Sequence, residues 1–140
     1  MGDYHILMQF DIDADRATVH RALATEEGIR SWWSSRADVD GDQLRVQFPD
    51  RPEPFAFTIR DSADRLEWVT GRFPPWWAGT TVRWDLTDNA DAPGTRLLFS
   101  HRDYEPDNPV IPIVTPAWAM IVSRLKGYSE TGDRQPFFDF

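Results

Sequence analysis

Few residues of this 140-residue chain have the types and spacing that chemistry at a site requires. The three histidines, His5, His20 and His101, are scattered with neither an HxxxH nor an HxH spacing, and the chain contains no cysteine. A metal site is therefore not expected, because closely spaced histidine and cysteine ligands are its usual signature. The sequence also lacks a Gly-x-Ser-x-Gly elbow, a GxGxxG loop and a P-loop. Neither a cofactor nor a catalytic residue is predicted.

His101 is the titratable residue of most interest, because it continues the apolar face formed by Leu97 and Phe99. In that position it could hydrogen-bond a ligand or act as an acid or base, with a pKa that burial would lower from about 6.5. The alternative is a histidine at a strand end that bonds to backbone or solvent. Thr70 and Thr95 are the other polar candidates on this face.

The aromatic content is unusual for so short a chain. Seven Trp, nine Phe and three Tyr make up 14% of the residues. Large aromatic side chains are stable in an interior only where the ring is packed and the polar edge finds a partner. The composition thus indicates a large core, an apolar cavity, or both.

The charge balance argues against several classes of partner. Acidic residues outnumber basic ones 23 to 15, which gives a net charge of −8, and such a surface repels nucleic-acid phosphates and anionic lipids. We therefore expect neither nucleic acid nor a membrane as the main partner. The first residues show no signal peptide, and no apolar run approaches the roughly 20 residues of a membrane span. A cytoplasmic location is the resulting expectation.

The residues that could bind must be positioned by regular elements. Residues 4–12 alternate between apolar and polar side chains, which predicts a half-buried strand. Asp13 or Asp15 can cap a helix after it, and Thr25, followed by two acidic residues, indicates a second short helix that ends near Trp32 and Trp33.

Residues 36–102 read as an antiparallel meander, because short alternating segments are separated by turn signals. Residues 104–116 carry four prolines and are expected to form a loop almost to their end. Apolar residues then recur at helical spacing from Val114 to Tyr128, and Gly132 suits the end of that helix. The long helix is the only predicted element that could cover the sheet. The prediction is a single α+β domain over residues 1–140, with a curved antiparallel sheet of six to seven strands around the C-terminal helix.

Four stretches together give the chain a family likeness. They are residues 14–33 with the Trp32-Trp33 pair, residues 79–84 (GTTVRW), residues 94–101 (GTRLLFSH) and residues 118–132. In this order they resemble the SRPBCC (START/Bet v 1-like) superfamily, and within it the branch named for the C-terminal domain of the Hsp90 ATPase activator. The resemblance implies a helix-grip fold with a cavity between sheet and helix. It also implies one of several roles: binding of hydrophobic ligands, cyclase or aromatase activity, or assistance to Hsp90.

The candidate site consists of large side chains that are expected on the inward faces of the strands and of the long helix, or at the mouth of the cavity. Trp76 and Trp77 follow two prolines, and are expected in a loop that forms a lid, makes a dimer contact, or packs back on the domain. Each of the inward rings could instead be ordinary core. The predicted ligand-binding residues are Trp33, Phe57, Trp68, Trp77, Trp84, Phe99, His101, Trp118 and Ile121.

The leading hypothesis is a non-enzymatic domain that binds a small hydrophobic molecule. It requires an interior cavity large enough for that ligand. The first alternative is an enzyme of the polyketide cyclase or dehydrase type, which requires a second acid or base beside His101. The second is a protein-interaction module of the Hsp90-activator type, which requires an exposed binding surface. A homodimer is compatible with each of the three.

Overall fold

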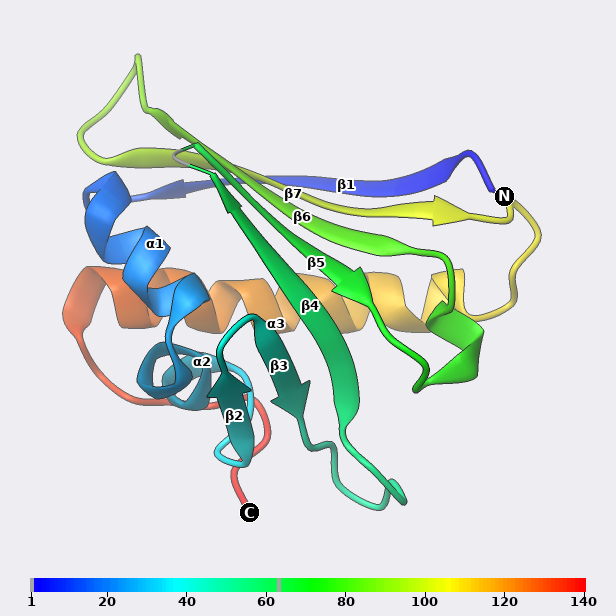
Figure 1. Cartoon of the computed structure of the whole chain (residues 1–140). Helices are drawn as coiled ribbons and strands as arrows, with labels where there is room; N and C mark the ends of the chain where they lie inside the picture. Colours follow the sequence, from blue (N-terminus) through cyan, green and yellow to red (C-terminus); the bar gives the residue numbers. More distant parts are fainter. Residues whose placement is uncertain (1, 63) are drawn as a thin grey trace.

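A computed structural model of the chain describes residues 2–62 and 64–140. They form a seven-stranded antiparallel sheet, ordered β1-β7-β6-β5-β4-β3-β2, with helices on one face (Figure 1). The α+β helix-grip prediction is confirmed. The elements are β1 (Tyr4–Ile12), α1 (Arg16–Ala24), α2 (Glu26–Trp32), β2 (Ala37–Asp40), β3 (Gln43–Val46), β4 (Phe55–Ser62), β5 (Arg65–Thr70), the 3₁₀ turn η1 (Pro75–Trp77), β6 (Thr81–Asp88), β7 (Thr95–Tyr104) and α3 (Ile111–Thr131).

The two short helices begin at the capping residues that the sequence suggested. Asp15, rather than Asp13, is the N-cap of α1, and its carboxylate accepts a hydrogen bond of 2.8 Å from the Thr18 amide. The Thr25 hydroxyl accepts from the Gly28 amide at 3.1 Å and donates to the Arg21 carbonyl at 2.6 Å. Thr25 therefore ends α1 and begins α2, since it satisfies groups that each helix end leaves unpaired.

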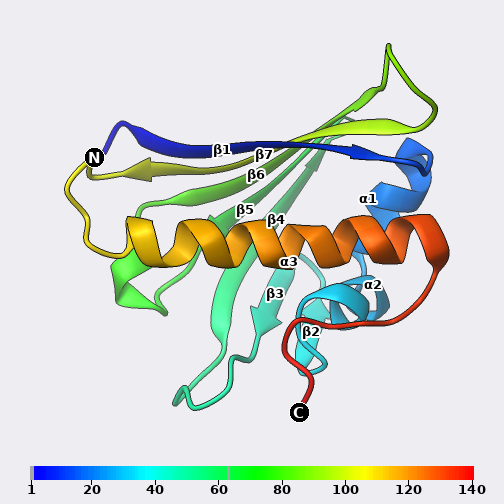
Figure 2. The ribbon, with the colours of Figure 1, turned by 180° about the vertical axis from the view of Figure 1, so that it is seen from behind.

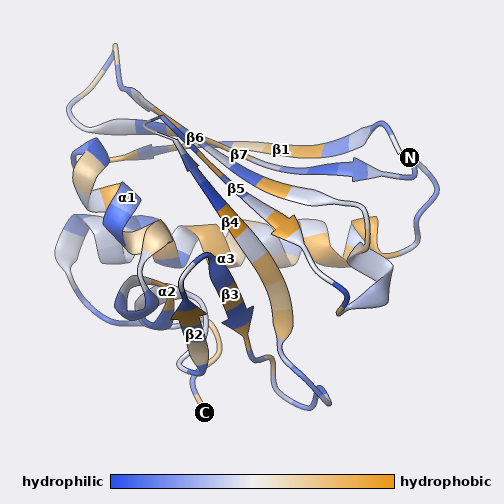
Figure 3. Ribbon diagram, in the orientation of Figure 1, coloured by the Kyte–Doolittle hydropathy of each residue, from blue (hydrophilic) through white to orange (hydrophobic). Residues whose placement is uncertain are grey.

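The strand register places large side chains in rows on one face of the sheet. Trp84 of β6 pairs with Leu66 of β5 and with Phe99 of β7. In the next row, Val82 pairs with Trp68 and with His101. Figure 3 shows polar and apolar residues alternating along the strands. Because side chains of one strand alternate between faces, these rows all project toward the helices.

Helix α3 covers that face and completes the core. Seen from behind, it lies in front of the sheet and runs alongside β1 (Figure 2). Its buried residues include Trp118, Val122 and Leu125. The helix ends as expected at Gly132, which adopts a left-handed conformation with φ of 80°. Among the described residues, no helix is both long and apolar enough to cross a membrane.

The expected loop over residues 104–116 is too long, because α3 already begins at Ile111. Pro112 lies in the first turn, where no backbone N–H is required. Pro116 lies inside the helix and removes one backbone hydrogen bond. Val114 and Trp118, on either side of it, are buried against the core. Tertiary packing therefore holds the helix through a residue whose local preference opposes it.

Candidate ligand site

The nine predicted ligand-binding residues come together in one cluster, and none is more than 4% exposed. Trp33 of the α2 C-terminus is stacked on Trp68 of β5 with ring centroids 5.6 Å apart, and its ring lies 5.2 Å from that of Trp118 in α3. The rings of Trp68 and Trp84 are 4.9 Å apart. Helix, sheet and η1 thus each contribute rings to a single aromatic core.

These rings fill most of the space between the sheet and α3. The described residues leave a slot of about 50 Å³ beside α3, whereas ligand pockets usually measure about 300–1,000 Å³. The slot therefore does not provide the ligand-sized interior cavity that the leading hypothesis requires. Phe57, Trp68, Trp84, Phe99 and His101 do not line it. It is lined by Trp33, Phe48, Trp76, Trp77, Val114, Ala117, Trp118 and Ile121.

His101 is held by three side chains within the core. The indole N–H of Trp118 donates to Nδ1 at 3.0 Å, so Nδ1 carries no proton. The Thr80 hydroxyl donates to the Trp77 carbonyl at 2.6 Å, and it therefore accepts from Nε2, 2.9 Å away. The Tyr104 hydroxyl lies 3.1 Å from Nδ1. These contacts assign the neutral tautomer that carries its proton on Nε2.

Burial lowers the pKa of His101 to about 3, because the charged form would lose its hydration. Burial also raises the pKa of Tyr104. Both groups are therefore neutral near pH 7, and both imidazole nitrogens are already engaged. None of the buried residues that the structure describes is an aspartate or a glutamate. Within the described interior, His101 therefore has a structural role as a centre of hydrogen bonds, and no buried carboxylate lies beside it.

The other two polar candidates bond to the backbone. The Thr95 hydroxyl donates to the Ala14 carbonyl at 2.7 Å. The Thr70 hydroxyl lies within 2.8 Å of the Trp77 carbonyl. Together with Thr80, which directly precedes β6, it anchors η1 to the sheet.

Several indole N–H groups have no such partner. The Nε1 atoms of Trp33, Trp68 and Trp84 are buried without a hydrogen bond among the described residues. In contrast, Nε1 of Trp32 donates to the Ala22 carbonyl at 2.7 Å. An unpaired buried donor costs about 1–3 kcal/mol. Trp33 and Trp77 each line the slot and have a buried Nε1 without a hydrogen bond among the described residues.

Trp76 and Trp77 have different environments. Trp77 packs back into the core, stacked on Trp118 with a centroid distance of 5.9 Å. Trp76 remains half-buried, with its edge toward Phe55 at 5.6 Å. Of the roles expected for this pair, Trp77 takes the one of packing on the domain. Trp76 instead forms part of the outer wall of the slot.

An apolar depression of about 360 Å³ lies outside this wall. It shares Trp76 and Val114 with the slot, so the two spaces adjoin. Ile113, at the start of α3, is 69% exposed there. We call the depression and the slot together the mouth groove. The depression is lined by Arg51, Trp76, Asn108, Pro109, Val110, Ile113 and Val114.

The sequence did not identify most of this mouth groove. Phe48, Val110, Ile113 and Val114 were not among the predicted site residues, and Val110 and Ile113 fell in the segment expected to be a loop. The available signal was the Trp76-Trp77 pair beside two prolines. That pair marked η1, but not the part of the chain that faces it.

Comparison with known proteins supports the fold. No family model and no curated protein matches the chain. Among solved structures, the Aha1 dimer from Colwellia psychrerythraea is 21% identical with a TM-score of 0.80, covering 92% of this chain and 98% of that one. The protein SSP2350 from Staphylococcus saprophyticus is 16% identical with a TM-score of 0.75, covering 97% and 98%.

DynU16, described as a protein of the dynemicin biosynthetic locus, is 20% identical with a TM-score of 0.71. The match covers 99% of this chain and 51% of that one. At these identities the likeness concerns the fold. The chain shares the fold of the Aha1 structure, which is the fold that the sequence resemblance predicted.

Proposed function

We propose that this protein binds a small hydrophobic ligand in the mouth groove, between η1, the segment 47–54 and the first turns of α3. The observation that carries the proposal is the apolar depression of about 360 Å³ that adjoins the slot. Its volume lies within the usual range for ligand pockets. Exposed apolar surface gathered in a hollow is also a common mark of a binding site.

The aromatic core explains why the ligand would bind mainly outside it. Trp77 is anchored through its carbonyl to Thr70 and Thr80, so η1 is held against the sheet. The ligand would therefore rest on Trp76, Ile113 and Val114, and would reach the slot with one end only. An acceptor on that end would suit the unpaired N–H of Trp33. Contact of a ligand with the five deeper predicted residues stays a prediction.

A neutral fluorescent probe tests this proposal. N-phenyl-1-naphthylamine should bind the purified protein, with its emission rising as it leaves water. Ile113→Asp should weaken its binding about ten-fold or more, because the substitution places a charge in the depression. Met120→Asp is the matched control, since Met120 is 54% exposed on the same helix and lies outside the depression.

Equal binding by both variants, or no binding to the wild type, would contradict the proposal. Native mass spectrometry of the freshly purified protein complements this titration. It would also identify any hydrophobic compound that remains bound during purification.

A protein-interaction role is the second candidate, and a homodimer is its simplest form. One structural neighbour is described as an Aha1 dimer, and Ile113 gives this chain an exposed apolar surface. Sedimentation of the wild type and of Ile113→Asp distinguishes the two functions. A dimer that becomes a monomer in the variant would favour the interface over the ligand site.

No specific contact among the described residues supports the alternative of a cyclase or dehydrase. His101 has both nitrogens engaged, and the described interior brings no carboxylate to it. A cytoplasmic location likewise stays a prediction.

A further inference from the structure

A wide surface hollow of about 740 Å³ adjoins the mouth groove. It lies between α2, the β2–β3 hairpin, the segment 47–54 and the C-terminal residue of the chain. Four of the chain's 15 basic residues line it, although the chain carries a net charge of −8. These four residues are Arg30, Arg36, Arg45 and Arg51.

Two of the four arginines already have carboxylate partners. Arg45 makes two hydrogen bonds of 3.0 Å to the carboxylate of Asp38. Arg30 donates to the Ala37 carbonyl at 2.6 Å and lies 3.4 Å from Glu26. These contacts hold α2 and the edge strand β2 in place. Arg30 and Arg45 are therefore engaged in the fold.

The other two arginines form no ion pair with a carboxylate side chain of the described residues. Arg36 donates from Nε to a carboxylate oxygen of Phe140, the C-terminal residue, at 3.0 Å, and its guanidinium lies over the Phe140 ring at 4.4 Å. The guanidinium carbon of Arg51 is 5.9 Å from the centroid of the Trp76 ring. Two carboxylate side chains line the same hollow: Asp38, which is paired with Arg45, and Asp50. Arg51 is thus the arginine of this wall that is engaged neither by a carboxylate side chain nor by the chain end among the described residues.

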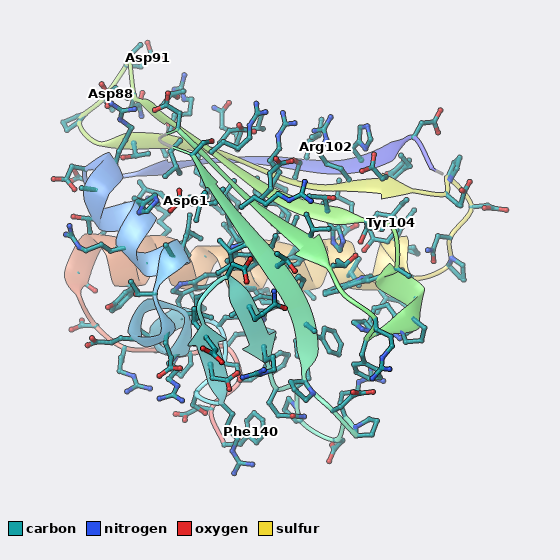
Figure 4. The ribbon with its side chains drawn as sticks, in the orientation of Figure 1. Asp61, Asp88, Asp91, Arg102, Tyr104 and Phe140 are labelled. Atoms are coloured by element: carbon teal, nitrogen blue, oxygen red, sulfur yellow. The ribbon has the colours of Figure 1, made fainter. Side chains whose placement is uncertain are left out.

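The hollow and the mouth groove form one continuous surface. Arg51 lines both the hollow and the apolar depression, and Phe48 lines both the hollow and the slot. Figure 4 shows Phe140 at one end of the molecule and the acidic residues Asp88 and Asp91 at the β6–β7 turn, far from it. Because Arg51 lines both spaces, it stands where the apolar depression meets the arginine-lined hollow.

We infer that the ligand of the mouth groove is an amphipathic anion, whose apolar body rests on Trp76 and Ile113 and whose anionic group binds Arg51. This inference rests on the proposed function. A guanidinium binds carboxylates and phosphates through paired, charge-assisted hydrogen bonds. The surrounding acidic surface repels anions in general. A free arginine at the rim of the apolar depression would select those anions that also carry an apolar body.

Calorimetric titration with matched eight-carbon compounds at pH 7.5 tests the inference. Octanoate should bind about five- to ten-fold more tightly than 1-octanol, because only the anion pairs with Arg51. Arg51→Gln should remove this advantage, so that octanoate no longer binds the variant more tightly than 1-octanol does. Arg60→Gln is the matched control, since Arg60 is exposed on β4, makes the same charge change and lines none of these hollows. Arg36→Gln should reduce octanoate binding by a smaller factor.

The outcomes separate the inference from the proposed function. If octanol binds as well as octanoate, or if Arg51→Gln and Arg60→Gln weaken octanoate equally, the inference is overturned and the hydrophobic site remains. If neither compound binds, the proposed function fails as well. Retained octanoate preference in Arg51→Gln would also overturn the role of this arginine. Circular dichroism of each variant confirms that the fold is intact.

Discussion

Trp76 and Trp77 are neighbours in the sequence, yet they belong to two different regions of the molecule. Trp77 is 3% exposed within the aromatic core, stacked on Trp118, and its carbonyl accepts hydrogen bonds from Thr70 and Thr80. Trp76 is half-buried at the mouth groove, beside the guanidinium of Arg51. The first ring is almost completely buried, whereas the second is only half-buried and lines the apolar depression.

The comparison extends to the polar groups of the two regions. In the core, His101 uses both nitrogens and binds Thr80 and Trp118. At the mouth groove, Arg51 carries a charge that no described carboxylate side chain pairs with. His101 therefore stabilises the fold, whereas the guanidinium of Arg51 remains free to bind.

The difference between the two tryptophans should be largest in stability. Trp77→Ala should lower the free energy of unfolding by about 3–5 kcal/mol, because it leaves a cavity in a packed interior. Trp76→Ala should lower it by about 1 kcal/mol, since its ring is only half-buried. Urea unfolding of both variants at pH 7 measures these losses. Similar losses would mean that η1 behaves as one unit and that the comparison is wrong.

The pH dependence of stability tests the buried state of His101. Its folded pKa of about 3 lies below the ordinary value near 6.5, so the unfolded chain binds more protons between these pH values. The stabilisation is complete above about pH 6.5 and decreases as the pH falls toward 3. The wild type should lose about 2–3 kcal/mol more than His101→Gln between pH 6.5 and 4.5. Parallel pH profiles for the two proteins would show that the imidazole is solvated.

The smallest effect on stability is expected at the mouth groove. Ile113→Asp should change the free energy of unfolding by less than about 0.5 kcal/mol, because the side chain is 69% exposed. The same substitution should have its large effect on probe binding instead. Thermal unfolding beside Met120→Asp measures the difference. If the free energy of unfolding falls by more than about 1 kcal/mol, Ile113 belongs to the packed core, and the distinction between the core and the mouth groove is weakened.

Much of the fold could be predicted because it depends on local patterns. Alternating residues in 4–12 predicted β1, and Thr25 marked the boundary between α1 and α2. The start of α3 could not be predicted in this way. Pro112 and Pro116 favour a loop locally, and only burial of Val114 and Trp118 against the sheet makes the helix stable there.

The candidate site was predictable only in part. The side chains facing inward followed from strand alternation, and all nine predicted residues do meet. The volume left between them did not follow, because it depends on how each ring is turned and packed. The exposed residues of the mouth groove carried no periodic signal, since Val110 and Ile113 lie just before and within the first turn of α3.

By itself, the sequence determined the helix-grip architecture, the face of each strand that is buried and the aromatic nature of the interior. These features could be predicted because side-chain periodicity, capping and turn preferences act over only a few residues. Only the tertiary structure decided that the rings fill the interior, that Trp77 rather than Trp76 joins them, and that Arg51 stands at the rim of an apolar depression. These features depend on packing and on contacts between segments far apart in the chain, which no local pattern records.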